Sequence, residues 1–136
     1  MVELNNYTKT KVDKKLFEKI AAYVFKQEKK KEQDISVAVV GIAKMRELNR
    51  VYRGKDYPTN VLSFEGEELG LGEIVLCPQI IRKDAVRYGI TEKEEFARAL
   101  VHGVLHVLGY EHEKGGQEEA RMQEQERRYL PLILTL

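Results

Sequence analysis

Residues 91–109 have the sequence TEKEEFARALVHGVLHVLG, which predicts a helix buried at the centre of the protein. Thr91 and Glu94 form a capping-box pattern, in which each side chain satisfies a backbone N–H left free at a helix start. From Phe96 to Leu108 the residues are apolar on nearly every side, as expected of a helix without a solvent-exposed face. Gly109 suits the left-handed conformation that ends many helices. The rest of the chain should therefore pack around this helix.

The three histidines of the chain, His102, His106 and His112, all lie within eleven consecutive residues. At about 100° per residue, a separation of four residues places His102 and His106 on one helix face, one turn apart. Gly109 lets the backbone reverse, so that His112 can return over the same face. We therefore expect the three imidazoles to bind one zinc ion per chain. Three ligands leave the fourth tetrahedral position open to water, which is typical of catalytic zinc sites.

This spacing is also that of the metzincin peptidases, HExxHxxGxxH, with one difference that matters for the chemistry. Gly103 stands where those enzymes have the glutamate that acts as general base. Peptidase activity is therefore not expected. The spacing leaves open a metal-dependent hydrolase acting on another substrate.

The composition indicates one soluble domain, residues 1–136. Hydrophobic residues make up 43% of the chain and charged residues 33%, enough for a core and a polar surface, which excludes disorder throughout. No apolar run reaches the roughly 18 residues of a membrane helix, and the first residues do not resemble a secretory signal. We expect a cytoplasmic protein without a membrane partner. Cys77, the single cysteine, excludes an internal disulfide and should be a small buried side chain.

The net charge of +1 conceals a basic N-terminal region. Residues 1–31 contain nine lysines and four acidic residues, so this region carries +5 and the remainder about −4. Two interpretations stay open: a surface that binds nucleic acid, or a helix face that is simply solvated.

Hydrophobic periodicity predicts the other elements. Amphipathic or charged patterns predict helices at 12–30, 44–53, 79–88 and 116–129, and short runs rich in β-branched residues predict strands at 35–42, 61–64 and 73–77. The tail 130–134 is too short to span a membrane and should pack on the core.

Three blocks resemble the YbeY family of metal-dependent endoribonucleases and rRNA maturation factors. Residues 102–112, HGVLHVLGYEH, are similar to the family pattern HGxLHLxGYDH. Residues 48–64, LNRVYRGKDYPTNVLSF, are similar to LNxxYRxxDxPTDVLSF, and residues 72–76, GEIVL, to GDIxI. The chain departs from these patterns at Asn60, Glu73 and Glu111, where the family has Asp, and at Val107, where it has Leu.

The resemblance implies an α+β fold, with a small, mostly parallel mixed sheet, surrounding helices and the metal in a cleft. It implies a single-strand-specific endoribonuclease acting in rRNA maturation and ribosome quality control, with an rRNA precursor as the RNA partner and the small ribosomal subunit as a candidate partner. A ribosome-assembly factor that binds RNA without efficient catalysis is the main alternative, because the histidine motif contains no general base.

Arg53 matches the arginine proposed to act near the metal in that family. A guanidinium presents a planar fork of donors suited to phosphate oxygens and could neutralise charge that develops during phosphodiester cleavage. The alternative is a surface arginine that complements the dipole at a helix C-terminus.

Glu111 is either a partner of the metal ligands or a solvated turn residue. Thr59 and Ser63 either contact substrate or form turns.

Overall fold

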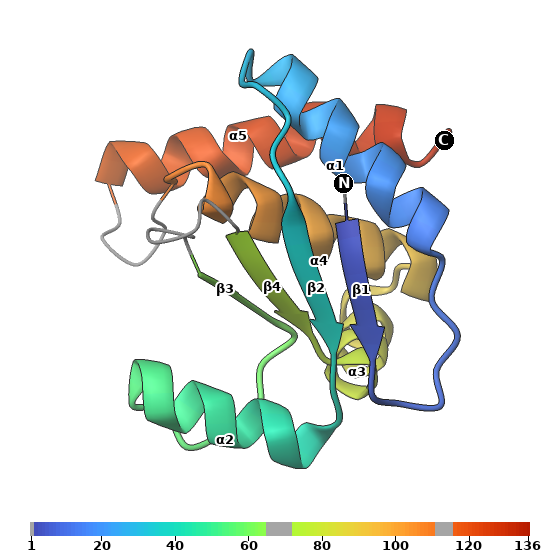
Figure 1. The fold of residues 1–136 in the computed structure, drawn as a ribbon, viewed down its shortest axis with the longest axis vertical. Helices are drawn as coiled ribbons and strands as arrows, with labels where there is room; N and C mark the ends of the chain where they lie inside the picture. The colour runs from blue at the N-terminus through green and yellow to red at the C-terminus, as the bar shows by residue number, and fades with distance from the viewer. Residues whose placement is uncertain (1, 65–71, 111–115) are drawn as a thin grey trace.

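The computed structural model describes residues 2–64, 72–110 and 116–136, which form a small α+β domain of four strands and five helices (Figure 1). The strands are β1 (Val2–Asn6), β2 (Ile35–Val39), β3 (Val61–Phe64) and β4 (Gly72–Leu76). The helices are α1 (Lys14–Gln27), α2 (Ile42–Arg53), α3 (Pro78–Tyr88), α4 (Glu92–Val107) and α5 (Gly116–Ile133).

The four strands form one sheet in the order β1-β2-β4-β3. β1 pairs with β2 and β2 with β4 in parallel, whereas β3 runs antiparallel to β4, with Val61 opposite Leu76. The expected small, mostly parallel mixed sheet is confirmed. β1 and β3 are the two edge strands, so residues of β3 lie at the sheet edge opposite β1.

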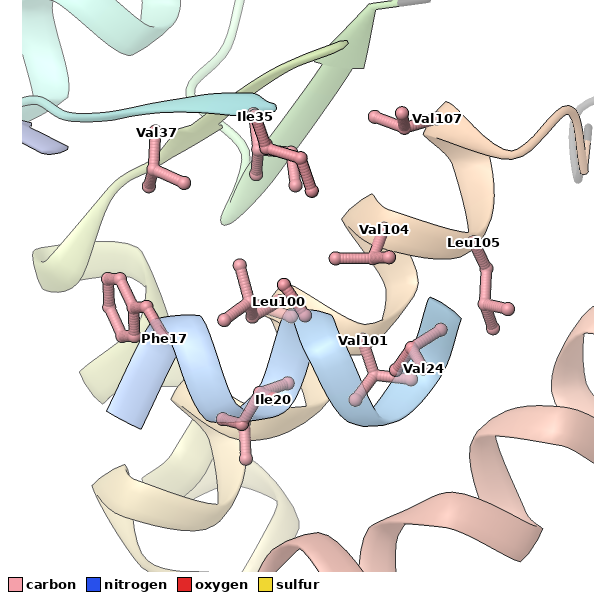
Figure 2. Close-up of a cluster of buried hydrophobic side chains, with 14 of the residues drawn as sticks. Phe17, Ile20, Val24, Ile35, Val37, Leu100, Val101, Val104, Leu105 and Val107 are labelled. Atoms are coloured by element: carbon pink, nitrogen blue, oxygen red, sulfur yellow. The ribbon is translucent and has the colours of Figure 1, made fainter. Parts of the chain in front are cut away.

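Helices cover both faces of the sheet. Ile35 and Val37 point from β2 into a core shared with α1 and α4, as Figure 2 shows. Alternate residues of the strands face the other way, where Leu62 and Val75 pack against Met45 of α2. α2 therefore lies apart from the group α1, α4 and α5 (Figure 1).

α4 is the central helix that the sequence predicts. It contacts β3, β4, α1, α3 and α5. The Thr91 side chain accepts a hydrogen bond from the Glu94 N–H at 3.1 Å, which confirms the cap. Gly109 has a φ of +103°, so the chain turns there as expected. Gly103 lets the helix approach the sheet closely, because a Cβ at this position would lie 3.0 Å from Cγ2 of Ile74.

The strands differ from the sequence prediction in two places. β1 is a strand that the sequence analysis does not predict, because VELNN contains only two apolar residues; in the structure only Val2 of this strand is buried. The predicted strand 35–42 ends at Val39, since Gly41 takes an extended conformation and becomes the N-cap of α2, which begins at Ile42. Ile42 is β-branched and so resembles a strand residue, but it lies in the first turn of α2; the predicted strand is therefore too long.

The last helix extends beyond its predicted end at residue 129. α5 continues through Pro131 to Ile133. Tyr129 and Ile133 are both buried and four residues apart, so packing on the core holds the final turn despite the missing proline N–H. No helix in the described part of the chain is both long and apolar enough to cross a membrane.

Candidate metal centre and phosphate-binding cleft

His102 and His106 project from the same side of α4, one turn apart. Their ring centroids are 5.4 Å apart and the ring planes are inclined by 60°. Both rings are partly exposed, whereas Val101 and Leu105 beside them are buried. The arrangement of these two histidines is the one that the spacing predicts, and it leaves both imidazoles accessible at the surface of the central helix.

Glu126 on α5 orients the ring of His102. Its Oε1 lies 2.6 Å from Nδ1 of His102, and the two side chains are only 14% and 26% exposed. An ionised carboxylate can only accept, so Nδ1 donates in this contact, and in a neutral imidazole the lone pair is then on Nε2. A histidine held in this way by a carboxylate is the usual arrangement around metal ligands. No local sequence pattern predicts this pair, because the two residues are 24 positions apart on different helices.

His112 and Glu111 lie outside the described residues, so the third ligand remains a prediction. Among residues 2–64, 72–110 and 116–136, no three His, Cys, Asp or Glu side chains are grouped so that they could hold a metal ion. The two histidines of α4 therefore form the described part of the candidate centre.

Glu28, the C-cap of α1, binds the side chain of Tyr110, the last described residue before His112. It accepts hydrogen bonds from the Tyr110 hydroxyl and from Nε2 of Gln125, both at 2.7 Å, and from the Tyr129 hydroxyl. Burial and the neighbouring carboxylate raise the pKa of Tyr110, so its hydroxyl stays a donor. This cluster fixes the backbone two residues before His112 to α1 and α5.

One cleft brings the histidine pair together with Arg53. The cleft has a volume of about 210 Å³, and we call it the Arg53 cleft. Its lining residues come from α2, β3 and α4: Tyr52, Arg53, Val61, Leu62, Ser63, Phe64, His102 and His106. Arg53 and His102 are 49 positions apart in the sequence, and the fold places both on the same hollow.

The end of α2 that carries Arg53 is firmly attached. Gly54 follows with a φ of +69°, and its N–H donates to the Arg50 carbonyl at 3.1 Å. The buried Asn49 donates to the Tyr57 carbonyl at 2.8 Å, which ties the following turn to the helix. Arg53 thus occupies the last turn of a helix and also lines the cleft, so both of its predicted roles fit its position.

His102 also lines a second cleft. This cleft also measures about 210 Å³ and includes three carboxylates, of Glu95, Glu119 and Glu126. We call it the Glu95 cleft. Oε1 of Glu95 accepts from Nε and Nη2 of Arg98 at 3.1 and 3.0 Å. Burial raises the pKa of Glu95, an effect that Arg98 partly opposes. His102 therefore lines both a cleft with Arg53 and two aromatic rings and a cleft in which three carboxylates accompany Arg98.

Asn60 and Ser63 fall in different clefts. Asn60 lines the Glu95 cleft, and Ser63 lines the Arg53 cleft from edge strand β3. Thr59 is half-buried, and its hydroxyl lies 3.5 Å from Oδ1 of Asn60. Ser63 is thus the one of the two proposed substrate-contacting hydroxyls that shares a cleft with the histidines.

The fold and these clefts define a small α+β protein with a candidate hydrolase site at one edge of its sheet. Comparison with known proteins adds its family. The family described as Endoribonuclease YbeY matches residues 3–133. The chain belongs to the YbeY family, which confirms the resemblance carried by the three sequence blocks.

Relatives match over most of the chain. Proteins named Endoribonuclease YbeY from Aquifex aeolicus and Sulfurovum are 42% and 37% identical to it, over 87% and 93% of this chain and 82% and 86% of theirs. The relative of the same name from Leptospira interrogans is 39% identical over 77% of this chain and 90% of its own length. A solution structure of a Thermotoga maritima protein covers 98% of this chain and 89% of its own, with 28% identity and a TM-score of 0.66.

Proposed function

We propose that the protein is a zinc-dependent endoribonuclease that cleaves single-stranded RNA during rRNA maturation and ribosome quality control. The observation that carries the proposal is the Arg53 cleft, where a phosphate-binding fork and two candidate metal ligands line one hollow. The relatives named Endoribonuclease YbeY support RNA as the substrate. An rRNA precursor, met on the small ribosomal subunit, is the substrate that the family resemblance implies.

The donor groups suit zinc. His102, His106 and His112 would supply three neutral imidazoles, and the contact of Nδ1 of His102 with Glu126 would leave Nε2 as the nitrogen free to bind a metal. Bound zinc supplies a concentrated positive charge that polarises a phosphodiester and acidifies water.

The chain's own residues would bind and orient the substrate. The Arg53 fork can donate to two phosphate oxygens at once and neutralise charge that develops on them. Gly103 offers no side chain to remove a proton, so the base does not come from the residue beside His102. The cleavage products identify the attacking group, because attack by the RNA 2′-hydroxyl leaves a cyclic phosphate and attack by water leaves a linear one.

The test is cleavage of a labelled single-stranded RNA by zinc-loaded wild type, by chelated wild type, and by His102→Ala prepared identically. We expect cleavage by the zinc-loaded wild type alone, together with one equivalent of zinc by elemental analysis. Equal cleavage by His102→Ala would expose a contaminating nuclease and contradict the proposal. A structured RNA measured alongside tests the single-strand preference.

A second candidate function uses the same cleft without efficient catalysis. It is favoured by Gly103, which replaces the usual general base of this histidine spacing. Such a ribosome-assembly factor would bind RNA and zinc, yet the zinc-loaded wild type would show no cleavage in this assay. Hydrolysis of a substrate other than RNA has only the histidine spacing in its favour.

A further inference from the structure

Tyr52 is an exposed aromatic residue that lines the Arg53 cleft. Its side chain is 63% exposed, although it lies in the last turn of α2 and lines the same hollow as the histidine pair. Its ring meets Phe64 of β3 edge to face, with centroids 5.1 Å apart. One exposed apolar side chain is ordinary by itself, so the surroundings of Tyr52 decide what it can do.

The surroundings of Tyr52 favour a polyanion. Arg53 follows it directly, and residues 42–57 contain five Lys or Arg against two acidic residues. The Glu95 cleft, which His102 also lines, contains three carboxylates and one guanidinium, that of Arg98. A phosphate backbone that reaches the histidines is therefore favoured in the Arg53 cleft, whose described lining has an arginine and no carboxylate, over the Glu95 cleft, where carboxylates outnumber the one guanidinium.

We propose that the Tyr52 ring is a stacking platform for one unpaired nucleobase of the RNA whose phosphate contacts Arg53. The proposal rests on the proposed function and deepens it, because it assigns the residue that selects single strands. Contact with Phe64 keeps the ring in place before RNA binds, so little conformational freedom is lost on stacking. A base inside a duplex has its faces covered by its neighbours and cannot use the platform.

Stacking on this ring has a defined effect on affinity and on sequence preference. Stacking of one base on an aromatic side chain changes affinity by roughly 5- to 150-fold. Every base has a flat face, so stacking at Tyr52 should tolerate all four bases. The platform would therefore provide strand selection, and Arg53 would position the phosphate.

The experiment combines protein variants with RNAs that lack one base. Single-stranded oligonucleotides with one abasic nucleotide, moved through successive positions, are titrated with zinc-loaded protein on ice by fluorescence anisotropy. Gels run in parallel confirm that the RNA is intact. The variants are Tyr52→Leu, which keeps apolar cover on Phe64, and Tyr52→Phe, which keeps the flat ring. Tyr7→Leu is the matched control, because Tyr7 is 74% exposed and follows β1 at the opposite sheet edge.

For wild type, one abasic position should weaken binding by roughly 5- to 150-fold. Tyr52→Leu should weaken binding to the intact RNA by a similar factor and be insensitive to that position, while Tyr52→Phe and Tyr7→Leu behave like wild type. If the affinity losses from Tyr52→Leu and from the abasic nucleotide multiply when the two are combined, the ring and the base do not interact and the proposal is wrong. It is also wrong if Tyr52→Leu binds the intact RNA with wild-type affinity. If wild type shows the abasic effect but cleaves no RNA, the proposed nuclease function fails while the platform stands.

Discussion

Glu126 lies within hydrogen-bonding distance of Nδ1 of His102 and so orients its ring, which should affect the strength of zinc binding. Its carboxylate lies 2.6 Å from Nδ1, and loss of such a partner typically lowers metal affinity about 10- to 100-fold. We predict that drop in zinc affinity for Glu126→Gln, measured by competition with a chromogenic chelator. Glu124→Gln is the control, because Glu124 is exposed and pairs with Arg127. Equal zinc affinity of Glu126→Gln and wild type would remove Glu126 from the site.

Arg53 distinguishes a catalyst from a scaffold. If it neutralises charge in the transition state, Arg53→Ala should slow cleavage by about 10²- to 10³-fold, with zinc content and thermal unfolding close to wild type. Arg53→Lys should restore little, because an ammonium lacks the planar fork. Arg50→Ala is the comparison. Arg50 lies three residues before Arg53 on α2, is exposed, and does not line the Arg53 cleft. A large loss of RNA affinity without any change in turnover would instead indicate a purely binding role.

At the residue scale, the sequence predicts what depends on local geometry. The placement of His102 and His106 follows from helical periodicity alone. Glu126 acquires its role only when α5 packs beside α4, and Tyr52 only when the end of α2 and β3 reach the histidines, although Tyr52 occupies the Tyr position of the family pattern. The role of Arg53 was suggested by the family resemblance, because its local sequence fits a simple helix end equally well.

At the element scale, the close contact between α4 and β4 depends on Gly103. Alanine favours a helix over glycine by about 1 kcal/mol, but its Cβ would lie 3.0 to 3.3 Å from three carbons of Ile74, which is completely buried. Overpacking typically costs about 1–3 kcal/mol, so we predict that Gly103→Ala lowers the free energy of unfolding by about 1 kcal/mol. Urea denaturation of the chelated protein measures this.

A double-mutant cycle identifies the cause of that loss. Ile74→Ala removes all three of the crowded carbons, so in its background Gly103→Ala should gain helix stability and no longer destabilise. The same loss in both backgrounds would show that the effect of Gly103→Ala does not come from contact with Ile74.

The sequence predicts some elements better than others, because some depend on local signals and others on long-range packing. α4 carries its own start signal at Thr91 and an apolar surface on nearly every side, so tertiary packing only reinforces it. β1 carries neither signal, because its pairing with β2 stabilises a mostly polar segment. The end of α5 depends on burial of Ile133, which outweighs the proline that would otherwise stop the helix.

At the scale of the whole molecule, the strand order separates two basic regions that the sequence leaves undifferentiated. β1 and β3 are the opposite edges of the sheet (Figure 1). α1 contacts β1, whereas residues of β3 line the Arg53 cleft. The strand order results from long-range pairing, so local sequence patterns do not predict which of the two regions neighbours the histidines. We therefore expect the exposed lysines of α1 to form a solvated helix face. The basic residues of α2 lie nearer the cleft that contains the histidines.

The salt dependence of RNA binding tests this separation. For single strands, the slope of log affinity against log salt falls by about 0.7 for each phosphate contact that is lost. We predict that Arg50→Gln combined with Lys55→Gln reduces the slope by up to about 1.4, because both residues are exposed beside Arg53. Lys15→Gln combined with Lys19→Gln removes the same charge from exposed positions on α1 and should leave the slope unchanged. Anisotropy titrations across a salt series measure both variants. A reduced slope for the α1 variant with a wild-type slope for the α2 variant would mean that the basic N-terminal region is the RNA-binding surface.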